Sequence, residues 1–386
     1  MNCAMMNIGE TMKKISKIRV KEKPLKWLKI IGIICCIFLG LFLFYSRQIK
    51  DLTKLGYSKE ASRKILFSFY KDDVLKVGES KTLNAAFLSK DFDEKYFDHY
   101  SKIEFVDQEH FILHINQLIE KGYSNRDINL IFAHGDDDSV GRFAQRERVK
   151  YIEEFYTIDY AKLDYYDRYL SYSYETGEDE DVSVLFVNLD LDKEDYVDAK
   201  LVTDTSSKML VNKHHYLSEN FEPMDLTEIG KEYASNPKLQ CSRIALIAYE
   251  KMSKAAEQEG YQIVINSAYR SYQDQVDLQE LYLKTYGQNY VDKYVAKPGY
   301  SEHQTGLAFD IGSRKVNVFA NSKEYTWMLE NAHKYGFILR FPKKFESITG
   351  FRQEPWHYRY VGEEVATYIH EHGISFEEYW ALFLDQ

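Results

Sequence analysis

The feature that most constrains this chain is an uncharged, mainly apolar run from Ile30 to Tyr45. Together with Trp27 at its leading edge, residues 27–45 would form a helix about 28 Å long, close to the hydrocarbon thickness of a bilayer. A helix in a soluble core rarely lacks polar positions over such a length. A secretory signal peptide would have a shorter apolar region followed by small residues, which Phe44–Arg47 does not supply. We therefore expect one transmembrane signal anchor at residues 27–45.

Basic residues are concentrated in the first 50 positions. Residues 1–50 contain ten Lys and Arg against two Glu, a net charge of +8, whereas the remaining residues contain 40 basic against 58 acidic residues, a net charge of −18. Because basic flanks stay in the cytoplasm, we expect a cytoplasmic tail at residues 1–26 and a chain exported after Arg47. The acidity of the exported part argues against a nucleic-acid partner, since such partners are bound by basic clusters.

Four cysteines add little covalent reinforcement. Cys35 and Cys36 lie in the apolar run, Cys3 lies in the basic tail, and Cys241 alone lies in the exported part. The exported part therefore cannot build a disulfide framework of its own.

Two segments share one local pattern, Gly-Tyr-Ser at residues 56–58 and again at residues 122–124. Each Gly is typical of a helix C-terminus and each Ser of the N-cap of the next helix. We predict a mainly helical extracellular region at residues 46–181 with an imperfect repeat of helical hairpins. This region is a stalk or binding module, or it is plain helical packing.

The acidic run at residues 176–181 separates this region from a second domain at residues 182–386. Strand-like runs there, at 182–187, 262–267 and 307–311, alternate with helical stretches at 237–258, 272–286, 322–334 and 363–373. This alternation predicts an α+β fold.

Two further acidic runs, at residues 134–138 and 190–195, lack the Gly and Glu positions of a calcium-binding EF-hand loop. Solvated turns explain them better than a cation site does.

The densest cluster of chemistry-bearing residues spans Gly299–Gly312, and Glu354-Pro-Trp-His357 follows it. Histidine and carboxylate are ligands that suit zinc. On a strand, Asp310 would face away from the large apolar residues that alternate with it. An extended path from His303 to Asp310 would span about 23 Å, too long for ligands of one ion. The chain must therefore turn at Gln304–Gly306, and Gly306 permits such a turn.

The segment around Glu354 is expected to be extended or turned, because Pro355 disfavours the helical conformation at the residue before it. His357 can then bind the metal while the Glu354 carboxylate reaches a water on it. Three protein ligands and a water form the open arrangement of a catalytic zinc site.

A third segment, Ser267–Gln275, lies where a strand is expected to end and a helix to begin. Arg270 at that edge could hold a substrate carboxylate or a developing oxyanion, because its guanidinium keeps its charge. It could equally be a solvated surface residue.

These three motifs, in this order, resemble the VanY-type D-alanyl-D-alanine carboxypeptidases of the LAS group of zinc peptidases. The motifs are Ser-x-x-Arg-Ser-x-x-x-Gln, Gly-Tyr-Ser-Glu-His-Gln-Thr-Gly-Leu-Ala-x-Asp and Glu-Pro-Trp-His-Tyr-Arg-Tyr-Val-Gly. Segments 210–213 and 223–226 resemble the start of the same domain, so the resemblance covers roughly residues 182–386. It implies an LAS-type fold, a small antiparallel sheet flanked by helices.

The resemblance also implies the roles of single residues. Zn²⁺ would be held by His303, Asp310 and His357, with Glu354 as general base and then general acid. Arg270 would stabilise the transition state. By the same comparison, Gln275 and Ser301 would line the substrate site.

The implied activity is removal of the terminal D-Ala from peptidoglycan stem peptides that end in D-Ala-D-Ala, outside the cell membrane. Related readings with the same fold are an L,D-carboxypeptidase and a D,D-dipeptidase. A non-catalytic wall-binding or signalling module is a further alternative, although the intact set of ligands and base argues against it.

Overall fold

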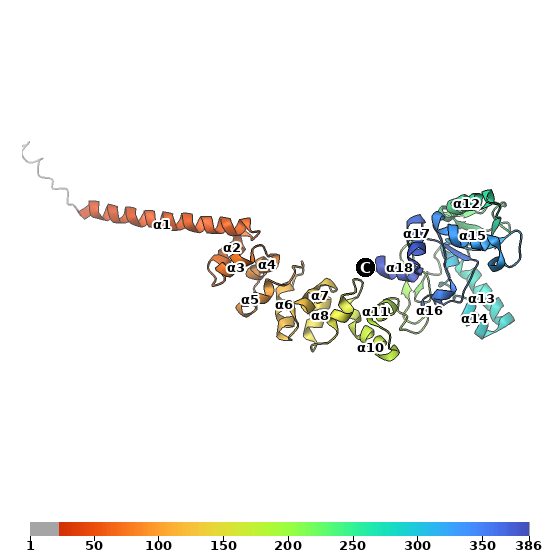
Figure 1. Ribbon diagram of the computed structural model, residues 1–386, viewed down its shortest axis with the longest axis horizontal. Coiled ribbons are helices and arrows are strands. Elements are labelled where there is room, and N and C mark those ends of the chain that lie inside the picture. The colour runs from red at the N-terminus through yellow and green to blue at the C-terminus, as the bar shows by residue number, and fades with distance from the viewer. Residues whose placement is uncertain (1–22, 386) are drawn as a thin grey trace, which may run out of the picture. The chain divides into compact units, whose positions relative to one another are not determined.

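The computed structural model describes residues 23–385, and its internal contacts divide the chain into two compact units (Figure 1). The first unit extends to residue 148 apart from residues 133–135, and the second comprises residues 133–135 and 149–386. The sequence predicted the domain boundary at the acidic run, residues 176–181. The contacts instead place the division earlier in the chain, near residue 148. Most of the predicted cytoplasmic tail, residues 1–26, lies outside the described residues.

The apolar run lies within helix α1 (Lys23–Lys54). An 18-residue window within residues 26–54 of this helix has a mean hydropathy of 2.5, and none of that window is buried by the rest of the chain. A helix with these properties near the start of a chain fits a membrane span and a signal sequence alike. Most residues in the last turn of α1 are polar, but Leu52 in that turn is apolar and is buried against the following helices.

Short helices make up the rest of the first unit and confirm the predicted helical character. The bounds are α2 (Lys59–Leu66), α3 (Lys71–Val77), α4 (Lys81–Leu88), α5 (Phe97–Tyr100), α6 (Phe111–Glu120), α7 (Asn125–Ala133) and α8 (Asp137–Gln145). The Gly-Tyr-Ser pattern behaves as predicted. Gly56 and Gly122 have φ of +93° and +84°, and the hydroxyls of Ser58 and Ser124 accept hydrogen bonds from backbone N–H groups of the next helix.

The same turn recurs at other helix ends in the second unit. Gly260, Gly373 and Asp190 also have positive φ. At each of these positions, as at Gly56 and Gly122, the N–H of the next residue donates to a carbonyl five residues back, at 2.9–3.3 Å. The sequence pattern hides the turn at Asp190, with φ of +60°, because the position is not a glycine.

The segment at residues 182–187, predicted as a strand, is instead helical and belongs to α11 (Glu180–Asn188). Asp179 caps this helix by accepting from the Val182 N–H at 3.0 Å. Ser183, Val184 and Val187 are buried at helical spacing. Tertiary packing and the cap therefore override the strand preference of the β-branched residues.

The acidic runs also differ from simple solvated turns. Asp136 caps α8, and Asp190 is 1% exposed and pairs with Arg168, Lys193 and Lys200 at 2.8–3.0 Å. Asp190 is therefore a structural anchor of the second unit. Its carboxylate is neutralised by basic side chains of the chain itself.

The second unit contains a four-stranded antiparallel sheet in the order β5-β6-β8-β7 and two smaller two-stranded sheets. The strands are β1 (Lys200–Leu201), β2 (His215–Tyr216), β3 (Leu226–Glu228), β4 (Gln240–Ser242), β5 (Ile263–Ser267), β6 (Ala308–Ser313), β7 (Phe337–Leu339) and β8 (His357–Tyr360). The strands expected at 262–267 and 307–311 are thus β5 and β6.

The second unit also contains helices, in keeping with the predicted α+β class. They are α9 (Ile152–Tyr156), α10 (Tyr166–Thr176), α11, α12 (Arg243–Gln258), α13 (Tyr272–Tyr286), α14 (Gln288–Tyr294), α15 (Lys323–Asn331), α16 (Glu346–Thr349), α17 (Glu363–His372) and α18 (Phe376–Phe383). The predicted helix at 237–258 starts later, at Arg243, because residues 240–242 form β4. One core cluster joins α12 and α15 to β5 and β6, and a second joins α17 and α18 to β7.

Candidate metal centre and active site

Strand register brings the three sequence motifs into one row. Ser267 on β5 pairs with Asp310 on β6, and Asp310 pairs with His357 on β8. The alternation predicted along β6 is confirmed, because Phe309 and Ile311 lie in the hydrophobic core while the Asp310 side chain remains 21% exposed. Ser267 of the first motif, Asp310 of the second and His357 of the third therefore lie next to one another across the sheet.

His303 reaches this row through the predicted turn. It lies in a 3-10 helix, Glu302–Thr305, that ends at Gly306 with φ of +67°. A Cβ at Gly306 would lie 2.9 Å from the backbone nitrogen of Ser242, so glycine is required by space as well as by conformation. The His303 Nδ1–H donates to the Ala268 carbonyl at 2.7 Å, and the Arg270 N–H donates to the His303 carbonyl at 3.2 Å.

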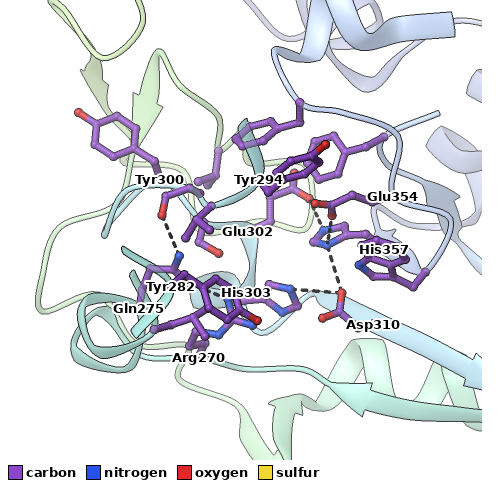
Figure 2. Close-up of a pocket in the computed structure, with 18 of the residues that line it drawn as sticks. Arg270, Gln275, Tyr282, Tyr294, Tyr300, Glu302, His303, Asp310, Glu354 and His357 are labelled. Carbon is purple, nitrogen blue, oxygen red and sulfur yellow. Dashed lines mark hydrogen bonds and ion pairs between the residues drawn. The ribbon is translucent and has the colours of Figure 1, made fainter. Parts of the chain in front are cut away.

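His303, Asp310 and His357 form a cluster whose ligand atoms all lie within 4.8 Å of one another (Figure 2). Oδ1 of Asp310 lies 3.5 Å from Nε2 of His303 and 3.4 Å from Nδ1 of His357. This buried oxygen has no hydrogen-bond partner among the residues that the structure describes. An orphaned carboxylate oxygen between two imidazole nitrogens is what a cation would satisfy.

The other nitrogen of each imidazole ring already has a polar partner, which also supports a cation site between the two rings. His303 uses Nδ1 for the Ala268 carbonyl, and His357 has Nε2 3.4 Å from Oε2 of Glu302. Each ring therefore turns its other nitrogen toward Asp310. Two nitrogens and one oxygen are the donor set of a three-ligand zinc site with an open position.

The charged groups of the cluster perturb one another strongly. Burial lowers the pKa of His303. Burial also acts to lower the pKa of His357, but the Asp310 and Glu302 carboxylates outweigh it and raise this pKa to about 9. The two imidazoles hold the pKa of Asp310 well below its usual range despite its burial.

Glu354 lies beside the cluster without sharing its centre. Its Oε2 is 3.5 Å from Nδ1 of His357, and its backbone N–H donates to the Phe341 carbonyl at 3.0 Å. Burial raises the pKa of Glu354 to about 7. As predicted, Pro355 keeps this segment out of a helix, and residues 352–356 form an extended stretch and a turn before β8.

Arg270 projects into the same cavity rather than into bulk solvent. Its Nη1 donates to Oε1 of Gln275 at 2.8 Å, and its Nη2 donates to the Ser267 hydroxyl at 3.2 Å. Gln275 is itself fixed by donating to the Ala296 carbonyl at 2.8 Å. In Figure 2, Arg270 and Gln275 lie on one side of the ligand cluster and Glu354 on the other.

All seven predicted site residues line one cavity of about 460 Å³. Ser301, which is 7% exposed, contributes to its wall beside His303. The structure therefore brings together Arg270, Gln275, Ser301, His303, Asp310, Glu354 and His357.

Sequence reasoning missed part of the cavity wall. Tyr282, Tyr290 and Tyr294 line it, and with Tyr286 they form a ladder of rings whose centroids lie 4.6–5.9 Å apart. The four-residue spacing of these tyrosines is visible in the sequence and would have indicated one helical face. Glu302 was also missed, because it is hidden inside the His303 motif.

Comparisons with known proteins show which family this chain resembles. Residues 238–363 match the VanY family model, described as D-alanyl-D-alanine carboxypeptidase. The chain is 41% identical over 179 residues to the YodJ protein of Bacillus subtilis (strain 168), covering 44% of this chain and 66% of that protein. It is 38% identical over 134 residues to a D-alanyl-D-alanine carboxypeptidase of Enterococcus faecalis (strain ATCC 700802 / V583), covering 32% and 50%. The chain thus spans between half and two thirds of these two relatives.

A shorter relative is matched over most of its length. This is the bifunctional D-Ala-D-Ala dipeptidase and D-Ala-D-Ala carboxypeptidase VanXYC of Enterococcus gallinarum, which is 34% identical over 177 residues, covering 44% of this chain and 91% of that protein. Among solved structures, the LdcB LD-carboxypeptidase aligns with a TM-score of 0.45 and 36% identity over 48% of this chain and 92% of that one. Because VanXYC is 34% identical and matched over 91% of its length, the chain belongs to the VanY-type D-alanyl-D-alanine carboxypeptidase family.

Proposed function

We propose that this chain is a membrane-anchored zinc carboxypeptidase that hydrolyses the terminal D-Ala from peptidoglycan stem peptides. One observation carries the proposal. Oδ1 of Asp310, which has no hydrogen-bond partner among the described residues, lies between His303 and His357. The same cavity also holds Glu354 and Arg270. These are the parts that metal-assisted hydrolysis of a peptide bond requires.

In this proposal His303, Asp310 and His357 hold the metal. Zinc, when bound there, supplies an acidified water and an electropositive partner for the carbonyl oxygen. Glu354 accepts the proton of the attacking water on its carboxylate and returns it to the amine nitrogen of the departing D-Ala. A buried carboxyl with a pKa near 7 is suited to both transfers.

Arg270 is the cation proposed to meet the anionic parts of the substrate. The exported part of the chain has a net charge of −18 and offers no general attraction to a peptide that ends in a carboxylate. Gln275 holds the guanidinium in place through its 2.8 Å hydrogen bond. Arg270 then stabilises the substrate carboxylate or the developing oxyanion, and Ser301 contributes a hydroxyl to the same wall.

Helix α1 is proposed as the anchor. The basic residues before it favour a cytoplasmic N-terminus, which would place the catalytic unit outside the membrane. The peptide proposed as substrate is also found there. Fractionation of cells that express the full chain, followed by protease shaving, tests this topology.

The test of the activity uses the purified full chain in detergent and three substrates. These are a pentapeptide ending in D-Ala-D-Ala, the tetrapeptide ending in one D-Ala, and free D-Ala-D-Ala. Mass spectrometry should show loss of one alanine from the pentapeptide with zinc and none after chelation. Turnover of the tetrapeptide or the dipeptide alone would favour an L,D-carboxypeptidase or a D,D-dipeptidase, and no turnover of any would favour a non-catalytic module.

A further inference from the structure

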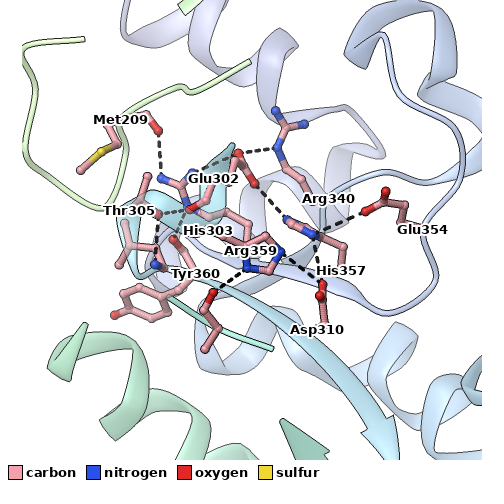
Figure 3. Close-up of polar contacts among 12 residues, drawn as sticks. Met209, Glu302, His303, Thr305, Asp310, Arg340, Glu354, His357, Arg359 and Tyr360 are labelled. Carbon is pink, nitrogen blue, oxygen red and sulfur yellow. Dashed lines mark hydrogen bonds and ion pairs between the residues drawn. The ribbon is translucent and has the colours of Figure 1, made fainter. Parts of the chain in front are cut away.

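Glu302 is a buried carboxylate with no role in the site described so far. Its residue is 3% exposed, and its two oxygens have different partners (Figure 3). Oε1 accepts from Nε of Arg340 at 2.8 Å and from Nη1 of Arg359 at 3.0 Å. Oε2 lies 3.4 Å from Nε2 of His357. One oxygen thus faces two cations, and the other faces a candidate metal ligand.

The charges around Glu302 are balanced within the fold. Arg340 makes a bidentate pair with Glu377 of α18, at 2.8 and 2.5 Å. Arg359 gives its other donors to backbone carbonyls, including that of Met209 at 2.9 Å. Two arginines and two carboxylates therefore form a neutral network, and each of these four side chains is at most 2% exposed. Such a network is costly to bury, and its geometry is correspondingly well defined.

The different partners of the two Glu302 carboxylate oxygens determine how Glu302 contacts His357. Because Oε1 is occupied by the arginines, Oε2 is left to accept the Nε2–H of His357. In the neutral ring that metal binding requires, the proton then lies on Nε2 and the Nδ1 lone pair points at Asp310, 3.4 Å away. Carboxylates that accept from a ligating imidazole fix its orientation and strengthen its binding to metal.

We propose that Glu302 is a positioning residue that sets the tautomer and orientation of His357 for metal binding. This inference rests on the zinc site proposed above and assigns a role to a residue outside the ligand set. Through Arg340 and Glu377, the same network ties the site to the C-terminal helix α18.

A purely structural role is the competing explanation, since Glu302 also anchors two arginines. The substitution Glu302→Gln separates the two, because an amide offers one acceptor oxygen where the carboxylate offers two. The matched control is Glu377→Gln, which makes the same change on the far side of Arg340 without contact to His357. Zinc affinity of the full chain is measured by competition with a chromophoric chelator, with no peptide present.

We expect Glu302→Gln to weaken zinc binding about 10- to 100-fold and to shift the visible bands of the Co²⁺-loaded protein. Glu377→Gln should leave the bands in place and zinc affinity nearly unchanged. Wild-type affinity in Glu302→Gln, or an equal loss in Glu377→Gln, would overturn the proposal.

If Glu302→Gln does not fold, as judged by loss of a cooperative melt, Glu302→Asp decides the matter. Aspartate keeps the charge for the arginines but its shorter side chain withdraws from Nε2. Weaker zinc binding with an intact melt supports the proposal, and unchanged binding overturns it. The zinc-binding measurements use no substrate, so they test the role of Glu302 separately from the proposed activity. If the wild-type chain bound zinc but released no D-Ala from the pentapeptide, only the proposed activity would be refuted.

Discussion

Oδ1 of Asp310 lies 3.5 Å from Nε2 of His303, and this buried oxygen accepts no hydrogen bond from any residue within 23–385. The pair comes from a 3-10 turn and a strand that Gly306 allows to fold back on each other. The oxygen is left for a ligand that the chain itself does not supply.

Replacing Asp310 should therefore abolish stoichiometric zinc binding. Asp310→Ala removes the only oxygen ligand of the three-residue cluster, and two imidazoles alone form an incomplete site. Asp277→Ala is the matched control, since this exposed aspartate on α13 pairs only with Gln273 nearby. Metal analysis after dialysis should find about one zinc in the control and wild type. Retention of zinc in Asp310→Ala would mean that the metal binds elsewhere.

Gln275 should matter through Arg270. Gln275→Ala removes the acceptor that fixes the guanidinium at 2.8 Å, and loss of one hydrogen bond to a charged group costs about 1.5–3 kcal/mol. We expect kcat/KM for the pentapeptide to fall by about tenfold or more, with zinc content unchanged. Gln273→Ala, on the solvent side of the same helix, should retain wild-type kinetics. Equal kinetics in the two variants would remove Gln275 from the site.

The tyrosine ladder should act on substrate binding rather than on chemistry. Tyr290→Ala removes a ring from the cavity wall, whereas Tyr286→Ala removes a neighbouring ring that is 57% exposed and not part of that wall. We expect KM to rise several-fold in Tyr290→Ala with little change in kcat, because the ring contacts the peptide equally before and during the reaction. A matching rise in Tyr286→Ala would point to a general disturbance of the α13–α14 hairpin.

His215 should make the second unit sensitive to acid. Burial lowers the pKa of His215 to about 4, below its ordinary value of 6.5, so the folded state favours the neutral ring. Its contribution to stability is complete above pH 6.5 and is lost as pH falls toward 4, by an amount of about 3 kcal/mol.

Urea titrations of the full chain at pH 7.5 and pH 4.5 test this. The stability difference between the two pH values should shrink in His215→Leu, which cannot be protonated. The Nδ1 contact to Asn212 at 3.1 Å is lost at both pH values and cancels in the comparison. An unchanged difference would show that His215 is not the acid-sensitive group.

Two of the three candidate ligands and the turn between them could be related from the sequence because they lie in one short stretch of it. His303, Gly306 and Asp310 span eight residues, and strand alternation with chain geometry sufficed to relate them. The helix–Gly–Ser–helix pattern of the first unit was equally local, since capping depends on immediate neighbours.

Features that depend on contacts between segments far apart in the sequence could not be predicted in the same way. The row that joins Ser267, Asp310 and His357 is set by strand register, including an irregularity in β5 between Ile265 and Ser267. The helical state of Val184 and its neighbours was decided by tertiary packing against their intrinsic preference. The side-chain partners of Glu302 are Arg340 and two residues of β8, His357 and Arg359. Both segments are distant from Glu302 in sequence, so its role was not visible in one motif.

The central claim is that zinc in this site and Glu354 together hydrolyse the terminal peptide bond. The most direct measurement is D-Ala release from the pentapeptide by Glu354→Gln, with bound zinc determined on the same sample. Because Glu354 is not among the three ligands, the account predicts unchanged zinc content and a fall in kcat of about 10²–10⁴-fold. Wild-type turnover by the zinc-loaded variant would contradict it.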